Sequence, residues 1–151
     1  DIAHQIVRHR SFSFQEFSQR YADPEAQGDM FEYSEARLQD PKNRQNSIEV
    51  EDKKLQDEWK NRQEEVALAA KYAYDWAIDQ GIAKEQARKV LPEGLTKTTL
   101  YMNGTLRSWI HYIDLRGANG TQKDHMEIAR LCAEVIAKIF PMTNELTYSS
   151  P

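Results

Sequence analysis

The most regular pattern of hydrophobic and polar positions runs from about residue 52 to residue 80. Apolar and small residues recur there at the helical repeat, with charged residues between them. We therefore predict one long amphipathic helix that ends at Gly81. We expect its buried face to consist of Leu55, Trp59, Val66, Ala69, Ala70, Ala73 and Ala77.

The same repeat predicts four shorter helical segments. They are the end of a helix at residues 1–10, a short helix at 83–91 before Pro92, a helix at 105–115, and a last helix at about 122–140. The predicted apolar face of the third is Leu106, Trp109, Ile110 and Ile113, and that of the last is Ile128, Leu131, Val135 and Ile139. We interpret His125, in the first turns of the last helix, as solvated.

Two segments favour extended structure. Polar and aromatic residues alternate from Phe12 to Tyr21, and the threonine-rich residues 96–102 predict a strand. Residues 24–52 are polar and irregular, which predicts a long loop or excursion. We predict a single domain over residues 1–151. Because the chain begins at Asp1 inside a helical pattern, we expect it to be a fragment that starts inside the fold.

Composition and charge limit the possible partners. Of the 151 residues, 20 are Lys or Arg and 24 are Asp or Glu, which gives a net charge of -4. This balance argues against general binding to nucleic acid or to an anionic membrane. The chain has one cysteine, Cys132, and lacks an apolar run of the roughly 18 residues that a transmembrane helix needs. We therefore expect a cytoplasmic protein, with Cys132 in its core.

The stretch from Arg8 to Tyr21 carries the densest candidate chemistry. Gln5, Arg8 and His9 are three or four positions apart and share a helix face. In an extended segment, Glu16, Ser18 and Arg20 also share a face, and Arg suits phosphate oxygens. The plainer alternative is a basic helix end that leads into a solvated strand. The four histidines have no zinc-site spacing, so we predict no metal.

Three segments in order resemble the signature blocks of the flavin-dependent thymidylate synthases, also called the thymidylate synthase complementing protein family. The first is Arg8-His9-Arg10, followed after seven positions by Ser18 and then Arg20. The second, E-Q-A-R-K-V-L-P, spans Glu85–Pro92, and the third, G-T-L-R-S-W-I-H-Y-I-D-L-R, spans Gly104–Arg116. Together they extend over most of the chain outside residues 24–52.

The resemblance implies a fold and a reaction. The fold would be α+β, with an antiparallel sheet flanked by long helices, and would lack the family's N-terminal region. The reaction would make dTMP from dUMP, with methylenetetrahydrofolate as carbon donor, NADPH as reductant and FAD as the flavin that carries the hydride. The enzyme would be a homotetramer with active sites between subunits, without nucleic-acid or membrane partners.

The resemblance also implies roles for individual residues. The flavin would be contacted by Arg8, His9, Arg10, Glu16, Thr105, Arg107 and His111. The dUMP ligands would be Gln5, Arg8, Glu16, Ser18, Gln19, Arg20, Arg88 and Arg116, with Arg88 supplied by a neighbouring subunit. Arg116 would be the catalytic residue that ionises the uracil at N3. We interpret Ser18 as a hydrogen-bonding ligand group rather than a nucleophile, since no base stands at a required spacing.

Two other functions fit the same residues. One is a binding module without catalysis, which would hold a nucleotide or single-stranded nucleic acid through the basic residues and Phe12, Phe14 and Phe17. The other is an inactive piece of the enzyme. Binding to a polyanion would weaken steeply with salt, whereas binding to one mononucleotide would not.

Overall fold

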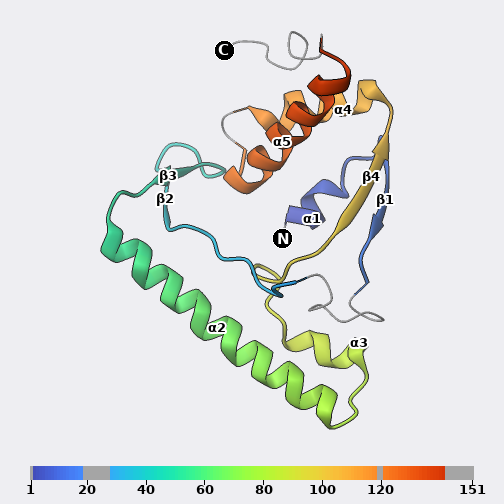
Figure 1. Cartoon of the computed structure of the whole chain (residues 1–151). Coiled ribbons are helices and arrows are strands. Elements are labelled where there is room, and N and C mark those ends of the chain that lie inside the picture. The colour runs from blue at the N-terminus through green and yellow to red at the C-terminus, as the bar shows by residue number, and fades with distance from the viewer. Residues whose placement is uncertain (1, 19–27, 119–120, 142–151) are drawn as a thin grey trace. The chain divides into compact units, whose positions relative to one another are not determined.

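The computed structural model describes residues 2–18, 28–118 and 121–141 (Figure 1). Two of the predicted ligand residues, Gln19 and Arg20, lie outside these ranges. The chain divides into two compact units. Unit 1 contains Gln15–Ala36 and Glu49–Tyr101, and unit 2 contains Ile2–Phe14, Arg37–Ile48 and Met102–Pro151.

The long predicted helix is the main element of unit 1. Helix α2 spans Lys53–Asp79, and the side chain of Asp52 caps its N-terminus by accepting from the backbone N–H groups of Lys54 and Leu55. Gly81 follows the helix with a positive φ of 75°, a conformation that glycine adopts without strain. Helix α3 (Lys84–Ala87) and the 3₁₀ turn η2 (Arg88–Val90) then occupy the predicted 83–91 segment.

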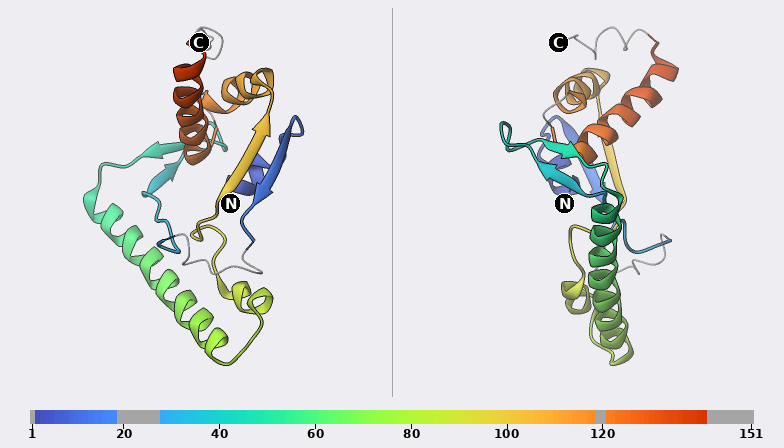
Figure 2. Two further views of the ribbon diagram at one scale, coloured as in Figure 1. Left: turned by 45° about the vertical axis from the view of Figure 1, so that its right-hand side comes forward. Right: turned by 90° about the vertical axis from the view of Figure 1, so that its left-hand side faces the viewer.

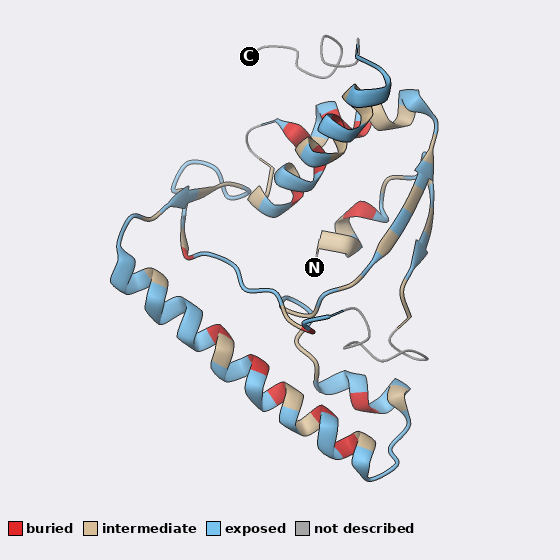
Figure 3. Ribbon diagram, in the orientation of Figure 1, coloured by how far each residue is buried: buried red, intermediate tan, exposed pale blue. Residues whose placement is uncertain are grey.

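The buried face of α2 differs from the predicted one. Ala70 and Ala77 are buried as predicted. Leu55, Trp59, Val66 and Ala69 are exposed, however, and Gln63, Ala67 and Tyr74 are buried as well. Figure 3 shows the buried positions of α2 among largely exposed ones. The reason is a need for backbone hydrogen bonds. The amide of Gln63 accepts from Ser34 N at 2.9 Å and donates to Ser34 O at 2.8 Å. Gln56 pairs with the backbone of Ala36 in the same way. Two glutamine side chains thus provide hydrogen-bond partners for the backbone N–H and C=O groups of Ser34 and Ala36.

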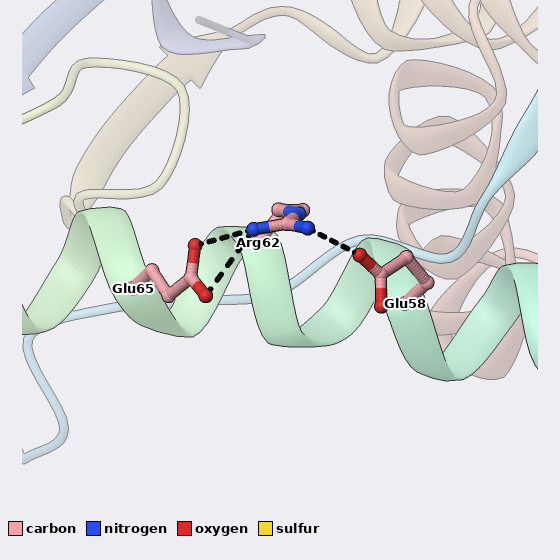
Figure 4. A network of polar contacts seen from close by, with 3 residues as sticks. All are labelled: Glu58, Arg62 and Glu65. Atoms are coloured by element: carbon pink, nitrogen blue, oxygen red, sulfur yellow. Dashed lines mark hydrogen bonds and ion pairs between the residues drawn. The ribbon is translucent and has the colours of Figure 1, made fainter.

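The opposite side of α2 carries ion pairs. Arg62 contacts Glu58 at 2.6 Å, one turn before it, and Glu65 at 3.0 Å, three residues after it (Figure 4). Pairs at these spacings support a helix locally, but solvent screens them, so they contribute little to stability.

Unit 2 is built around the contact between two helices. Helices α4 (Leu106–Gly117) and α5 (Lys123–Ile139) pack against each other, as both views in Figure 2 show. Their shared core consists of Tyr112, Ile113, Ala129 and Ala133, with Phe12, Met102, Trp109, Cys132 and Ile136 around it. Helix α1 (Ile2–Ile6), strand β2 (Arg37–Gln39) and strand β3 (Ser47–Glu49) up to Ile48 belong to the same unit.

The predicted orientation of α5 is wrong. Ile128, Leu131, Val135 and Ile139 are exposed in the single chain, and the buried residues are His125, Ala129 and Ala133. The physical reason is close approach, since alanine at every fourth position lets α5 lie against α4. His125 occupies the same row, and its exposed fraction is 0%. The interpretation of His125 as solvated is therefore also wrong.

The strands form two small antiparallel sheets. Strand β1 (Phe12–Glu16) pairs with β4 (Leu100–Gly104), and β2 pairs with β3. The predicted strand from Phe12 to Tyr21 ends at Glu16, and the β2–β3 hairpin lies within residues 24–52. Helices and antiparallel strands confirm the α+β prediction. No described helix is long and apolar enough to cross a membrane.

Gly104 on β4 is required by the ring of Phe12. A Cβ atom at position 104 would lie 2.6 Å from Cε1 of Phe12 and closer still to Cδ1. Gly104→Ala should therefore lower the free energy of unfolding by about 1–3 kcal/mol, measured by urea denaturation. Gly94→Ala is the matched control, because its Cβ would meet nothing within 4 Å. Equal stability of the two variants would contradict this packing.

The burial of His125 makes stability depend on pH. Burial is the main cause that lowers its pKa from 6.5 to about 4. The positive charge of Arg116 lowers it further, as does that of His9 once His9 is protonated at low pH. The unfolded chain therefore binds a proton near pH 6.5 that the folded protein does not bind, so stability is full above pH 6.5 and falls as the pH drops toward 4. Between pH 7 and pH 5 the free energy of unfolding should fall by about 2 kcal/mol because of this histidine.

The measurement is the free energy of unfolding of wild type and His125→Gln at both pH values. The loss between pH 7 and pH 5 should be about 2 kcal/mol smaller in the variant. The same pH dependence in both proteins would show that His125 is not the group responsible.

Candidate functional site

Most of the predicted site residues lie in unit 2. Gln5, Arg8, His9 and Arg10 follow one another at the end of α1, and Thr105, Arg107, His111 and Arg116 lie on or next to α4. The remaining described residues, Glu16, Ser18 and Arg88, belong to unit 1. The structure therefore brings the first two groups into one unit.

The chain stays helical for one turn beyond α1. Arg8 N donates to Gln5 O at 3.3 Å, and His9 N donates to Ile6 O at 3.0 Å. This turn keeps Gln5 and His9 four positions apart on one face, as the spacing predicts. Both side chains are half-buried, whereas Arg8 and Arg10 are exposed. The turn therefore presents two cations to solvent and two polar side chains to the interior of the unit.

His9 connects this turn to Arg116 on α4. Arg116 donates from Nε to Nε2 of His9 at 3.1 Å, so Nε2 is the unprotonated nitrogen of a neutral ring. The pKa of His9 is lowered by burial first, then by the positive charges of Arg116 and His111. The His9 ring also meets Tyr112 edge-on, with ring centroids 4.9 Å apart. Arg116 is thus held by a neutral histidine, and its two terminal nitrogens take no part in that bond.

Two buried residues that the sequence analysis missed lie behind these side chains. His125 Nε2 is 3.1 Å from the hydroxyl of Tyr112, and His125 Nδ1 is 3.2 Å from Oε1 of Gln5. Burial raises the pKa of Tyr112 to about 12. The sequence did carry a signal for the burial of His125. This residue lies four positions before Ala129 and eight before Ala133, so it shares a helix face with two small residues that allow close packing.

The start of α4 holds the residues predicted to contact a flavin. Thr105 is the N-cap, and its hydroxyl accepts from Ser108 N at 3.2 Å. Arg107 and His111 are exposed and one turn apart. Thr105 therefore has a structural role in starting the helix, while Arg107 and His111 remain accessible to a ligand.

The predicted residues of unit 1 have other surroundings. Oε1 of Glu16 accepts from the Thr98 hydroxyl at 3.1 Å. Ser18 is half-buried, just beyond the end of β1, and Arg88 is exposed at the start of η2. Across residues 2–18, 28–118 and 121–141, no group of three or more His, Cys, Asp or Glu side chains is placed to hold a metal ion.

Two relatives match nearly the whole chain. It is 49% identical over 140 residues to a probable flavin-dependent thymidylate synthase of Paramecium bursaria Chlorella virus 1. It is 47% identical over 140 residues to the flavin-dependent thymidylate synthase of Synechocystis. Each match covers 93% of this chain but only 63% of the relative, so the chain spans less than two thirds of their length.

Among solved structures, the chain is similar to the UMP/dUMP methylase PolB from Streptomyces cacaoi bound with 5-Br dUMP. The TM-score is 0.76 at 24% sequence identity, and the match covers 96% of this chain and 66% of that one. The form of the same methylase bound with 5-Br UMP matches with a TM-score of 0.75. At this level of identity the similarity shows a shared fold.

The sequence profile described as thymidylate synthase complementing protein matches residues 1–142, which is nearly the whole chain. This match agrees with the names of the two relatives and with the order of the three signature blocks. The chain therefore belongs to the thymidylate synthase complementing protein family, the flavin-dependent thymidylate synthases.

Proposed function

We propose that this chain methylates dUMP to dTMP as a cytoplasmic FAD-dependent enzyme that uses methylenetetrahydrofolate and NADPH. The observation that carries the proposal is the hydrogen bond from Arg116 to His9, whose ring rests edge-on against Tyr112. Tyr112 is in turn hydrogen-bonded to His125, which contacts Gln5. His9 and Arg116 belong to two different signature blocks, and they meet although more than 100 positions separate them. The methylase PolB, which shares the fold, supports a uridine nucleotide as the substrate.

In this proposal Arg116 stabilises negative charge on the uracil. Methylation at C5 needs electron density on the ring, and a negative charge at N3 supplies it. An arginine stays protonated at neutral pH, so it acts as a fixed cation and not as a base. Its Nε is held by His9, which orients the guanidinium and leaves the terminal nitrogens for the base. His9 stays neutral beside it and adds no competing positive charge.

The exposed cations of unit 2 suit the charge of a flavin dinucleotide. Arg8 and Arg10 are exposed after α1, and Arg107 and His111 are exposed on α4. The charge of His111 also lowers the pKa of His9, which stands between Arg8 and Arg10 in the chain. These side chains would hold the diphosphate and the ring system, as Arg binds both phosphate and planar groups. When bound, FAD would carry the hydride that reduces the transferred carbon.

The other proposed ligands complete the nucleotide site. Glu16, Ser18, Gln19, Arg20 and Gln5 would hold dUMP, and Arg88 would reach its phosphate from a neighbouring subunit of a homotetramer. The exposure of Arg88 in the single chain is consistent with that role.

The direct test of this function is the variant Arg116→Ala. It should keep the flavin absorbance of the FAD-loaded protein but lower kcat for dTMP formation by about 10²–10³, the usual cost of one electrostatic donor. Arg62→Ala, which removes an exposed arginine of α2, is the matched control and should turn over normally.

Undiminished turnover by Arg116→Ala would remove this residue from the mechanism. If the wild-type chain with FAD gives neither flavin absorbance nor dUMP-dependent NADPH oxidation, the proposed activity of this chain is wrong.

A further inference from the structure

A line of four hydrogen bonds between side chains runs through unit 2 behind the proposed nucleotide site. The buried hydroxyl of Tyr112 is 3.1 Å from His125, and His125 is 3.2 Å from Gln5. Gln5 donates to Gln122 at 2.7 Å, and Gln122 donates to Asp124 at 3.4 Å. The line therefore starts at an exposed carboxylate and ends at one of the most buried side chains of the unit.

The carboxylate of Asp124 sets the direction of every bond in this line. An ionised carboxylate only accepts, so Gln122 must turn its amide nitrogen toward Asp124 and its oxygen toward Gln5. Gln5 then donates from Nε2 and turns Oε1 toward His125. Because an amide oxygen only accepts, the proton of His125 is on Nδ1. The unprotonated Nε2 accepts from the Tyr112 hydroxyl.

If these hydrogen bonds ran in the opposite direction, acceptor oxygens would face each other. If Gln5 turned its nitrogen toward His125, its oxygen would face the oxygen of Gln122 unless Gln122 also turned. A turned Gln122 would place its oxygen against the carboxylate of Asp124, which repels it. His125 also has one ring proton only, since its pKa is about 4 and the ring is neutral at pH 7.

The donor-to-acceptor direction of these hydrogen bonds decides whether Gln5 presents a donor or an acceptor to a ligand. Its oxygen is occupied by His125, and one hydrogen of its nitrogen is donated to Gln122. An amide nitrogen carries two hydrogens, and among the described residues the second has no partner. Gln5 thus presents a donor, which pairs with an acceptor oxygen such as a phosphate or carbonyl oxygen. An inverted amide would present its own oxygen to the same ligand atom and repel it.

From this geometry we propose that His125 is a positioning residue for nucleotide binding, which fixes the Gln5 amide as a hydrogen-bond donor toward an acceptor oxygen of dUMP. The inference rests on the proposed function, since it takes Gln5 to be a ligand of dUMP. It adds the roles of His125 and Tyr112, which touch no ligand and act through Gln5. The two partners of His125 hold its ring so that only Nδ1–H faces Gln5.

The test compares two polar replacements of His125 that differ in where the amide group lies. The amide nitrogen of His125→Asn takes the place of Nδ1 and can still donate to Gln5. The longer side chain of His125→Gln takes the place of Nε2, keeps a partner for Tyr112 and removes the donor to Gln5. By calorimetry, dUMP affinity should fall about tenfold in His125→Gln and less than threefold in His125→Asn.

A double-mutant cycle with Gln5→Met separates positioning from a general effect on folding. If His125 acts through Gln5, adding His125→Gln to Gln5→Met should weaken dUMP binding less than threefold further. Independent tenfold losses in the two backgrounds would overturn the proposal, as would equal affinities of His125→Gln and wild type. Weaker dUMP binding by His125→Asn than by His125→Gln would overturn it too.

Deoxyuridine, which lacks the phosphate, identifies the acceptor oxygen. A loss seen only with dUMP places the Gln5 donor on the phosphate, and an equal loss with both ligands places it on the base or sugar. If wild type binds neither ligand, the proposed function fails and this inference fails with it. If wild type binds and the variants behave alike, only the role of His125 is wrong.

Discussion

The hydrogen bond between His125 and Gln5 is the interaction on which the arrangement of the proposed site depends. It joins α5 to α1 across the interior of unit 2, between residues 120 positions apart. A fully buried imidazole without partners would cost about 1–3 kcal/mol for each unpaired nitrogen. Because Gln5 and Tyr112 together satisfy both nitrogens, the ring is tolerated in the core and locks its neighbours in place.

The packing of α5 against α4 places His125 next to its partner. The small side chains of Ala129 and Ala133 bring α5 close to α4, and this closeness places His125 against Tyr112. Tyr112 in turn supports the His9 ring, which holds Arg116. The buried pair Tyr112 and His125 thus helps to set the positions of Gln5, His9 and Arg116, the side chains that would meet the nucleotide. Burial keeps the His125 ring neutral, so its one proton has a defined place.

The sequence pattern located the helices well, and it placed Ile113 of α4 and Ala70 and Ala77 of α2 correctly on buried faces. It missed the rest of the buried face of α2 and the whole buried face of α5. Period and end signals placed α2, α4 and α5 within two residues of their observed bounds. Gln63 was missed on the buried face of α2 because its amide pairs with backbone that is distant in sequence. The buried face of α5 was missed because hydrophobicity favours large residues, whereas close packing selected Ala129 and Ala133. Helical spacing placed Gln5 and His9 on one face. The spacing of His125 with Ala129 and Ala133 could have indicated that His125 is buried, but it could not identify Gln5 and Tyr112 as its partners, because they are distant in sequence.

The central claim is that His125 is neutral with its proton on Nδ1. The most direct measurement is a long-range ¹H–¹⁵N NMR spectrum of the ring nitrogens of His125 at pH 7, assigned by comparison with His125→Gln. The hydrogen-bond directions predict a protonated Nδ1 and an unprotonated Nε2, unchanged down to about pH 5. A proton on Nε2 alone, or an imidazolium at pH 7, would contradict the account.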